Sequence, residues 1–271
     1  MKLGGAKMAD LEKAIAYVQH HGTLVEQAQL RYVLTGSTVS PEICAAFLKD
    51  QRPDGSWSAF WAPHAASIDA TCYHLIQAEY MGLLAPMHPA LARGIMFLQQ
   101  RQSAEGYWEE DVQLRDVAPP WAMPGDLAAI LYLTANCGFC LARLAGTKES
   151  GLAASAYLSR YLKDDGTLPS FVHTQWLAAS LWYYLDQYEP AYRVFSSLQK
   201  RLEGDVSAGN LVWLIASLHD ARIPMKHPLL ENATHLLEQK QKEDGRWESD
   251  DGPPFDVRTT LEVIRVMLLG K

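Results

Sequence analysis

Asp69 is the residue of this chain whose type and position most directly suggest chemistry. It lies second in an apolar run, residues 68–82, between the hydroxyl side chains of Ser67 and Thr71. Burial raises the pKa of a carboxyl group, so such a residue can keep its proton near neutral pH. The two hydroxyls, or His173 from another apolar run, could then stabilise the carboxylate that remains. Asp69 is therefore a candidate general acid; the alternative is an ordinary carboxylate at a helix start, favoured by the helix dipole.

Aromatic residues could line a cavity beside such an acid. They make up 10% of the chain, which includes eight Trp. A ring face attracts a nearby cation without attacking it. For each ring, packing in a helical core is the alternative. The candidates lie on apolar runs or in the loops that lead into them: Trp61, Tyr73, Trp121, Tyr132, Phe139, Phe171, Trp176 and Trp213.

The other carboxylates favour structural roles. Asp126 precedes an apolar run and is expected to cap it. The acidic clusters at residues 109–111 and 250–251 follow the repeated Trp residues described below, and we expect them to be solvated loop carboxylates. The alternative is a diphosphate held there through magnesium, but the D-D-x-x-D pattern is missing.

A metal site is not expected, and no cofactor is implied. Asp69, Cys72 and His74 are close in sequence. On a helix, however, His74 would point away from the other two, and no Cys/His spacing typical of structural zinc occurs.

The cysteines are interpreted as buried thiols. The four are Cys44, Cys72, Cys137 and Cys140. The last two have the C-x-x-C spacing of a redox motif, but they lie inside a long apolar run with no preceding βαβ pattern. Core packing is therefore favoured, and a cytoplasmic location is predicted.

The elements that must position these residues are helices. Helical periodicity extends over nearly the whole chain, strand alternation is absent, and Gly and Pro mark the helix ends. Amphipathic runs, such as residues 189–201 and 228–242, alternate with runs that are apolar on nearly all sides, and the latter should be buried on both faces. The N-terminal segment adds one pair, residues 11–20 and 24–34. The other apolar runs are residues 68–82, 127–144, 172–184, 206–218 and 257–269.

A seven-residue pattern, Q-x-x-x-G-x-W, punctuates these runs. It occurs three times, at residues 51–57, 102–108 and 241–247, and the stretch around Gly166 keeps only the glycine. We expect the Gly to end the amphipathic helix, the Gln to bond backbone groups at a neighbouring helix end, and the Trp to cover that end. These are structural roles, so the repeated Trp residues are not placed in the chemistry.

The repetition predicts one domain, residues 1–271, because no linker interrupts it. Six pairs of amphipathic and apolar helices can close into a ring with the apolar helices inside. An open superhelical stack is the alternative.

Composition excludes several classes of function. The net charge of −7 argues against a nucleic-acid partner, which needs a basic surface. No apolar run is read as long enough for a membrane span, and the N-terminus has no apolar core of a signal peptide. Peripheral membrane contact and the oligomeric state are left open.

The three copies resemble the QW repeats of the terpene cyclase and prenyltransferase superfamily. That superfamily includes squalene–hopene cyclases, oxidosqualene cyclases, class II diterpene cyclases and protein prenyltransferase β subunits. The resemblance covers nearly the whole chain and implies an all-α fold, the (α/α)6 barrel. Large cyclases of the group carry two barrels, whereas the length of this chain allows one. The chain therefore resembles a monodomain class II terpene cyclase.

The resemblance also implies a reaction. The acid of these cyclases is the middle Asp of D-x-D-D-T, which corresponds to Asp69; the motif Thr corresponds to Thr71, while Ser67 and Ala70 replace the outer Asp residues. Asp69 would protonate an alkene or epoxide of an isoprenoid, and the cation would cyclise between aromatic walls. A prenylated aromatic substrate is favoured over a prenyl diphosphate because no diphosphate site is apparent. The alternatives are a non-catalytic barrel that binds an isoprenoid or a partner, and a subunit that requires an α partner.

Overall fold

The chain folds almost entirely into α-helices. The computed structural model describes residues 9–84, 87–146 and 148–269. The helices of this part are α1 (Leu11–His21), α2 (Leu24–Thr35), α3 (Pro41–Leu48), α4 (Ile68–Glu79), α5 (Pro89–Gln100), α6 (Leu127–Leu144), α7 (Glu149–Ser159), α8 (Val172–Tyr184), α9 (Tyr188–Arg201), α10 (Ala208–Asp220), α11 (Pro228–Glu238) and α12 (Asp256–Leu269). Three short 3₁₀ helices, η1 (Val112–Leu114), η2 (Pro120–Ala122) and η3 (Pro253–Phe255), lie in the loops.

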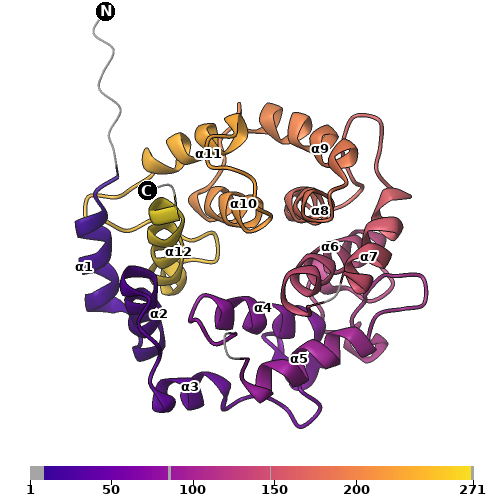
Figure 1. Ribbon diagram of the computed structural model, residues 1–271, viewed down its shortest axis with the longest axis horizontal. Coiled ribbons are helices and arrows are strands. Elements are labelled where there is room, and N and C mark those ends of the chain that lie inside the picture. Colours follow the sequence, from indigo (N-terminus) through magenta and orange to yellow (C-terminus); the bar gives the residue numbers. More distant parts are fainter. Residues whose placement is uncertain (1–8, 85–86, 147, 270–271) are drawn as a thin grey trace, which may run out of the picture. The chain divides into compact units, whose positions relative to one another are not determined.

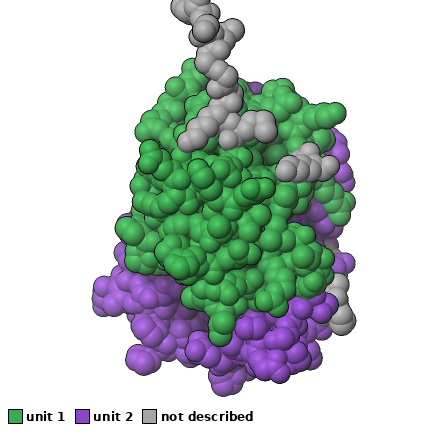
Figure 2. Space-filling model, turned by 90° about the vertical axis from the view of Figure 1, so that its left-hand side faces the viewer, with its two compact units in different colours: residues 1–37, 199–271 green, residues 38–198 purple. Residues whose placement is uncertain are grey.

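The described residues form two compact units, coloured separately in Figure 2. Unit 1 combines the residues up to Ser37 with those from Gln199 onward, and unit 2 runs from Thr38 to Leu198. Asp69 and all but one of the candidate site residues belong to unit 2. That the whole chain forms one domain stays a prediction.

Helix α6 is the central helix of unit 2. It packs against α4, α5, α7 and α8; α4, α6 and α8 follow one another along one side of the unit, with α5 and α7 on the other (Figure 1). Asp126 caps it by accepting from the backbone N of Ala129 at 3.0 Å, as predicted. Its 18 residues are long and apolar enough to cross a membrane, but 78% of that stretch is buried inside the protein. Burial on all sides explains its apolar composition.

A short hairpin precedes α4, and the sequence did not predict it. Strands β1 (Trp57–Ala59) and β2 (Ala62–Ser67) pair antiparallel, with Trp57 opposite Ser67 and an irregularity after Ser58. The pairing places the end of the first repeat beside the first turn of α4. The strands are too short and too rich in Ala and Ser to show a period-two pattern.

The Gln of each repeat joins its own turn to another amphipathic helix. In every copy, Nε2 donates to the carbonyl of the repeat Gly and to one further carbonyl. The further acceptors are Ala90 at 2.6 Å from Gln51, Ser150 at 2.9 Å from Gln102 and Asp10 at 2.9 Å from Gln241. These carbonyls belong to the first turns or caps of α5, α7 and α1, so the predicted role of the Gln is confirmed.

The repeat Gly does not end the helix, and that prediction was wrong. Helix α5 ends at Gln100, well before Gly106. Gly106 instead has a φ of +97°, and a Cβ there would lie 2.4 Å from the carbonyl oxygen of Ala153 in α7. The missing side chain lets the turn press directly against the backbone of the next helix.

The Trp of each repeat joins two helices. Its backbone N donates to a threonine hydroxyl of the following apolar helix: Trp57 to Thr71 at 3.0 Å, Trp108 to Thr134 at 3.1 Å and Trp247 to Thr260 at 3.0 Å. The buried indoles of Trp108 and Trp247 also donate to carbonyls of the preceding amphipathic helix, Leu98 and Leu237, each at 2.8 Å. The repeats thus hold helices together.

Candidate active site

Asp69 lies in the first turn of α4, and its carboxyl group is buried at 8% exposure. Two donors from α6 converge on one oxygen: the hydroxyl of Tyr132 lies 3.1 Å from Oδ1, and Nδ2 of Asn136 lies 3.4 Å from it. The indole of Trp121 donates a third hydrogen bond to the carboxyl group. Among the described residues, the hydrogen bonds to the carboxyl group of Asp69 therefore come from neutral donors.

Burial raises the pKa of Asp69 above its ordinary value, and the three donors offset part of this rise. A raised pKa keeps the proton on the carboxyl group, whereas donors aimed at Oδ1 stabilise the carboxylate that forms when the proton leaves. Because Oδ1 accepts from Tyr132 and Asn136, Oδ2 is the oxygen better placed to carry a proton. The arrangement can act as a general acid.

Glu110 is a second buried carboxyl group at the same helix start, with 2% exposure. Its Oε1 accepts from Ser67 Oγ at 2.6 Å and from the backbone N of Asp69 at 3.1 Å, and its Oε2 accepts from the backbone N of Ile68 at 3.0 Å. The prediction that residues 109–111 are all solvated was therefore wrong for Glu110. Burial and the neighbouring Asp69 charge raise the pKa of Glu110, and its donors lower it.

The sequence suggested that Ser67 and Thr71 could donate hydrogen bonds to Asp69. The structure gives both hydroxyls other partners. Ser67 Oγ accepts from the backbone N of Ala70 at 3.1 Å and donates to Glu110. Thr71 Oγ1 donates to the carbonyl of Ser67 at 2.6 Å and accepts from Trp57. The Ser67 hydroxyl therefore caps α4, and the Thr71 hydroxyl joins α4 to the first repeat.

His173 was a further predicted helper, and the structure does not place it on Asp69. It lies in the first turn of α8, with its ring edge-to-face against Trp176 at 5.0 Å. Within the part of the chain that is described, the side chains that contact the carboxyl group of Asp69 come from α6 and from the loop before it.

Four predicted aromatics gather around the acid. Tyr132 touches Asp69 directly and meets Phe171 edge-to-face at 6.3 Å between ring centroids. Trp121, on η2, remains 44% exposed and meets Trp61 edge-to-face at 6.1 Å. The loop of residues 112–125 therefore folds back onto the start of α6 and carries Trp121 to the acid.

The other predicted aromatics lie elsewhere. Tyr73 packs edge-to-face on Phe60 at 5.4 Å, and Phe139 packs on Tyr184 at 6.2 Å. Trp176 is buried in α8, whereas Trp213 lies on α10 in unit 1. A role for these four rings in the site stays a prediction.

The cysteines behave largely as predicted. Cys72, Cys137 and Cys140 are buried free thiols whose pKa values burial raises; hydrogen bonding to Cys72 contributes most at Cys140. Cys44 is only partly buried. Among the described residues, no group of three or more His, Cys, Asp and Glu side chains could hold a metal ion. A cytoplasmic location stays a prediction.

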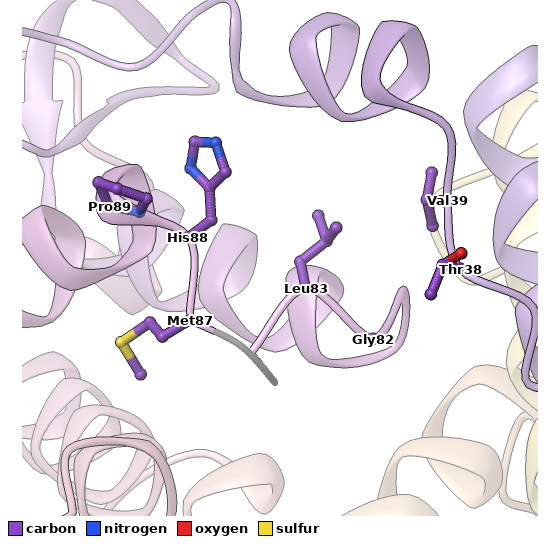
Figure 3. A pocket seen from close by; sticks show the side chains of 7 residues that line it. All are labelled: Thr38, Val39, Gly82, Leu83, Met87, His88 and Pro89. Carbon is purple, nitrogen blue, oxygen red and sulfur yellow. The ribbon is translucent and has the colours of Figure 1, made fainter.

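A small pocket of about 310 Å³ lies beyond the opposite end of α4 (Figure 3). Residues 38–39 and 87–89 lie on opposite sides of residues 82–83 in this view, and most of the lining is apolar. Helix α4 separates the pocket from Asp69 along its length, which at 1.5 Å per residue is roughly 18 Å. The pocket therefore does not belong to the acid site.

Comparison with known proteins relates the fold to one group of enzymes. A variant of type II terpene cyclase MstE from Scytonema, in complex with geranylgeranyl dihydroxybenzoate (substrate), matches with a TM-score of 0.64 and 14% identity over 96% of each chain. A second variant of this enzyme, in complex with merosterolic acid A (product), matches with a TM-score of 0.62 and 14% identity over 95% of each chain. The apo structure of MstE matches with a TM-score of 0.60 and 15% identity over 96% of each chain.

The likeness confirms the predicted fold class, which is all-α with the fold of terpene cyclases. No protein-family model matches the chain, and no curated protein matches it. At this identity the likeness shows the fold, and the chemistry must be argued from the residues around Asp69.

Proposed function

We propose that this protein is a class II terpene cyclase in which Asp69 is the general acid. The observation that carries the proposal is the buried carboxyl group of Asp69, whose pKa is raised and whose Oδ1 is held by Tyr132 and Asn136. The fold supports it, because the similar structures are of a type II terpene cyclase.

In the first step Asp69 transfers its Oδ2 proton to a carbon of a terminal alkene. The π electrons form the new C–H bond, the other alkene carbon becomes a cation, and Asp69 becomes a carboxylate. Internal alkenes of the chain then attack in turn, and each attack forms a C–C bond and moves the cation along. Loss of a proton ends the sequence, so the product is an isomer of the substrate and the acid is restored. An epoxide would be opened by the same proton.

The surrounding side chains serve this chemistry in two ways. Tyr132, Asn136 and Trp121 stabilise the Asp69 carboxylate by hydrogen bonds at the moment the proton leaves. The rings of Trp61, Trp121 and Phe171 offer faces that stabilise a cation and cannot capture it as a nucleophile would.

The proposed substrate is a prenylated aromatic compound. The structures of variants of the similar enzyme are complexes with geranylgeranyl dihydroxybenzoate (substrate) and with merosterolic acid A (product). In our chain the buried groups at Asp69 are neutral donors, a second carboxyl group and thiols. This surrounding suits an apolar prenyl end more than a diphosphate.

The test is incubation of the purified protein with geranylgeranyl dihydroxybenzoate in D₂O, followed by chromatography and mass spectrometry. A cyclised isomer that carries one deuterium from Asp69 is expected. Asp69→Asn should lower turnover by roughly 10²–10⁴-fold, because the amide cannot supply the proton. Asp126→Asn is the matched control: Asp126 is exposed, and Asn caps a helix about as well.

Full turnover by Asp69→Asn would remove Asp69 as the acid. Absence of product together with tight binding of the prenylated ligand would favour the alternative, a barrel that binds an isoprenoid or a partner without catalysis.

A further inference from the structure

In the described part of the chain, the carboxyl group of Glu110 accepts hydrogen bonds from three donors at the start of α4. Ser67 Oγ and the backbone N of Asp69 donate to Oε1, and the backbone N of Ile68 donates to Oε2. Ser67 Oγ accepts from the backbone N of Ala70 and directs its own hydrogen at Glu110. Such a set of partners fits a carboxylate, which only accepts, better than a carboxylic acid.

The geometry points to Glu110 as a positioning residue for the acid: it carries the negative charge at the start of α4 and thereby keeps the proton on Asp69. The inference rests on the proposed role of Asp69. Ser67 and Ala70 stand where the D-x-D-D-T motif has its outer Asp residues. In their place Glu110, on a loop 41 positions after Asp69, supplies a carboxylate beside the acid.

The backbone of α4 gives the first reason. Free N–H groups at a helix start stabilise a nearby anion and would favour the ionised form of Asp69. Here Glu110 accepts from the amides of Ile68 and Asp69, and Ser67 accepts from that of Ala70. The carboxyl group of Asp69 therefore receives none of these three amides.

The charges around Asp69 give the second reason. The titratable groups around Asp69 are Tyr132 and Cys137 on α6, Cys72 on α4 and Glu110 on the loop between α5 and η1. Burial raises the pKa of the tyrosine and of both thiols, which keeps them neutral near pH 7. Among the described residues, the groups that act most strongly on either carboxyl include no cation.

Two neighbouring buried carboxyl groups resist a second ionisation. Burial raises the pKa of both carboxyl groups, and each has three donors. Two of the donors to Glu110 are backbone amides of the helix start, one on each oxygen, whereas Asp69 has side-chain donors alone, so Glu110 is the better site for the charge. Asp69 keeps the proton in the resting protein and gives it up only when an alkene accepts it. The repulsion between the two carboxylates that then exist favours the return of a proton to Asp69 after the final deprotonation.

The titration of Asp69 tests this without any need for turnover. Protein labelled with ¹³C at the aspartate carboxyl carbons is titrated by NMR, and the Asp69 signal is identified by its loss in Asp69→Asn. In Glu110→Gln the midpoint of Asp69 should fall by about one pH unit or more, because the neighbouring charge is gone. Glu110→Asp, which keeps the charge, should remain closer to the wild type.

Glu105→Gln is the matched control, since it makes the same charge change on the same loop at an exposed residue that pairs with Arg160. Its Asp69 midpoint should equal that of the wild type. Should Glu110→Gln not fold, Glu110→Ala gives the same comparison without an amide against the helix donors. An unchanged or raised Asp69 midpoint in the charge-removing variant overturns the role of Glu110.

Turnover provides a second readout. Turnover needs protonated Asp69, so it falls as pH rises through the midpoint, and in Glu110→Gln this fall should occur at lower pH, with KM little changed. A uniform loss of turnover at every pH would indicate a merely structural role and would contradict the inference. If the wild type forms no product at all, the proposed function fails, while the NMR titration still decides the effect of Glu110 on Asp69.

Discussion

Tyr132 and Asp69 occupy equivalent positions in successive repeats, and they contact each other at 3.1 Å. Each lies two residues before the threonine that accepts from a repeat Trp, Thr134 in α6 and Thr71 in α4. The two helices are therefore joined to their repeats alike, and the same position relative to the threonine carries the acid in α4 and its hydrogen-bond donor in α6.

Tyr132→Phe should raise the pKa of Asp69, whereas Glu110→Gln should lower it. The hydroxyl lowers the pKa of Asp69, so its removal raises that pKa further. The loss of turnover with rising pH should then begin at higher pH. The maximal rate should still fall, by roughly 10–100-fold, because one hydrogen bond to the developing carboxylate is missing. A pH–rate profile measures both effects, and a shift of the high-pH limb to lower pH would contradict the assignment.

Asp69→Asn should stabilise the folded protein while it abolishes turnover. The pKa of Asp69 is raised on folding, so its contribution to stability is fully present below the unfolded pKa of about 3.9 and is lost as pH rises through the folded pKa. The amide has no such dependence. At pH 7 we expect a gain of about 1 kcal/mol, or roughly 2–4 °C in Tm, which shrinks towards pH 4. Calorimetry at several pH values measures this, and equal Tm differences at all pH values would argue against a raised pKa.

Thr71→Val should destabilise unit 2 and leave the titration of Asp69 unchanged. The valine has nearly the same shape, but it leaves the buried N–H of Trp57 without its acceptor, at a cost of about 1–3 kcal/mol. Thr35→Val is the control, because that hydroxyl is exposed and bonds only its own segment. Thermal unfolding and the ¹³C titration are the measurements. A moved Asp69 midpoint would restore Thr71 as a partner of the acid.

Gly106→Ala should cost far more stability than Gly36→Ala. Both glycines have positive φ, +97° and +67°, so both substitutions strain the backbone. Only at Gly106 would the new Cβ also meet a carbonyl, that of Ala153 at 2.4 Å, whereas Gly36 has no heavy atom within 4 Å. We expect about 1 kcal/mol for Gly36→Ala and roughly 2–4 kcal/mol for Gly106→Ala. Urea unfolding of both variants gives the comparison, and equal losses would mean that the close approach to α7 is absent in solution.

A thiol reagent should modify about one cysteine in the native protein at neutral pH. Cys44 is partly exposed, whereas Cys72, Cys137 and Cys140 are buried and their pKa values are raised. Thiolate is the reactive form, so the three buried thiols should react only after unfolding. Colorimetric titration counts the thiols, and Cys44→Ser should remove the native reaction. Rapid reaction of a further thiol would show that the region beside Asp69 opens.

The bounds of a helix could be predicted from the sequence where the helix is buried on all sides. The bounds of α6 and α8 match the predicted runs 127–144 and 172–184, since a helix surrounded by protein is apolar on every side. Helix α11 ends at Glu238 and not at residue 242, because the amphipathic pattern runs on into the turn of the repeat. Asp69 was predictable as the carboxyl group at the start of such a helix.

The burial of Glu110 was not predicted because clusters of charged residues are normally solvated. All three residues at 109–111 are acidic, so composition does not distinguish Glu110 from its neighbours. The repeats held the missing signal. Glu110 lies two residues after Trp108, and the residue two after Trp57 is Ala59, which is buried and apolar. The first copy alone carries this signal, because the third has Ser249 at the position, which is polar and only partly buried. The donors Tyr132 and Asn136 could not be found in this way, because their meeting with Asp69 depends on how α4 packs against α6.

The bond between Gln241 and Asp10 spans 231 positions of the chain and ties the last repeat to the cap of α1 within unit 1. The ribosome makes α1 and α2 first, yet the helices they pack on, α12 above all, are made last. Unit 1 therefore cannot complete its core during synthesis. The faces of α1 and α2 that pack on α12 therefore stay uncovered until unit 2 and α12 have been made.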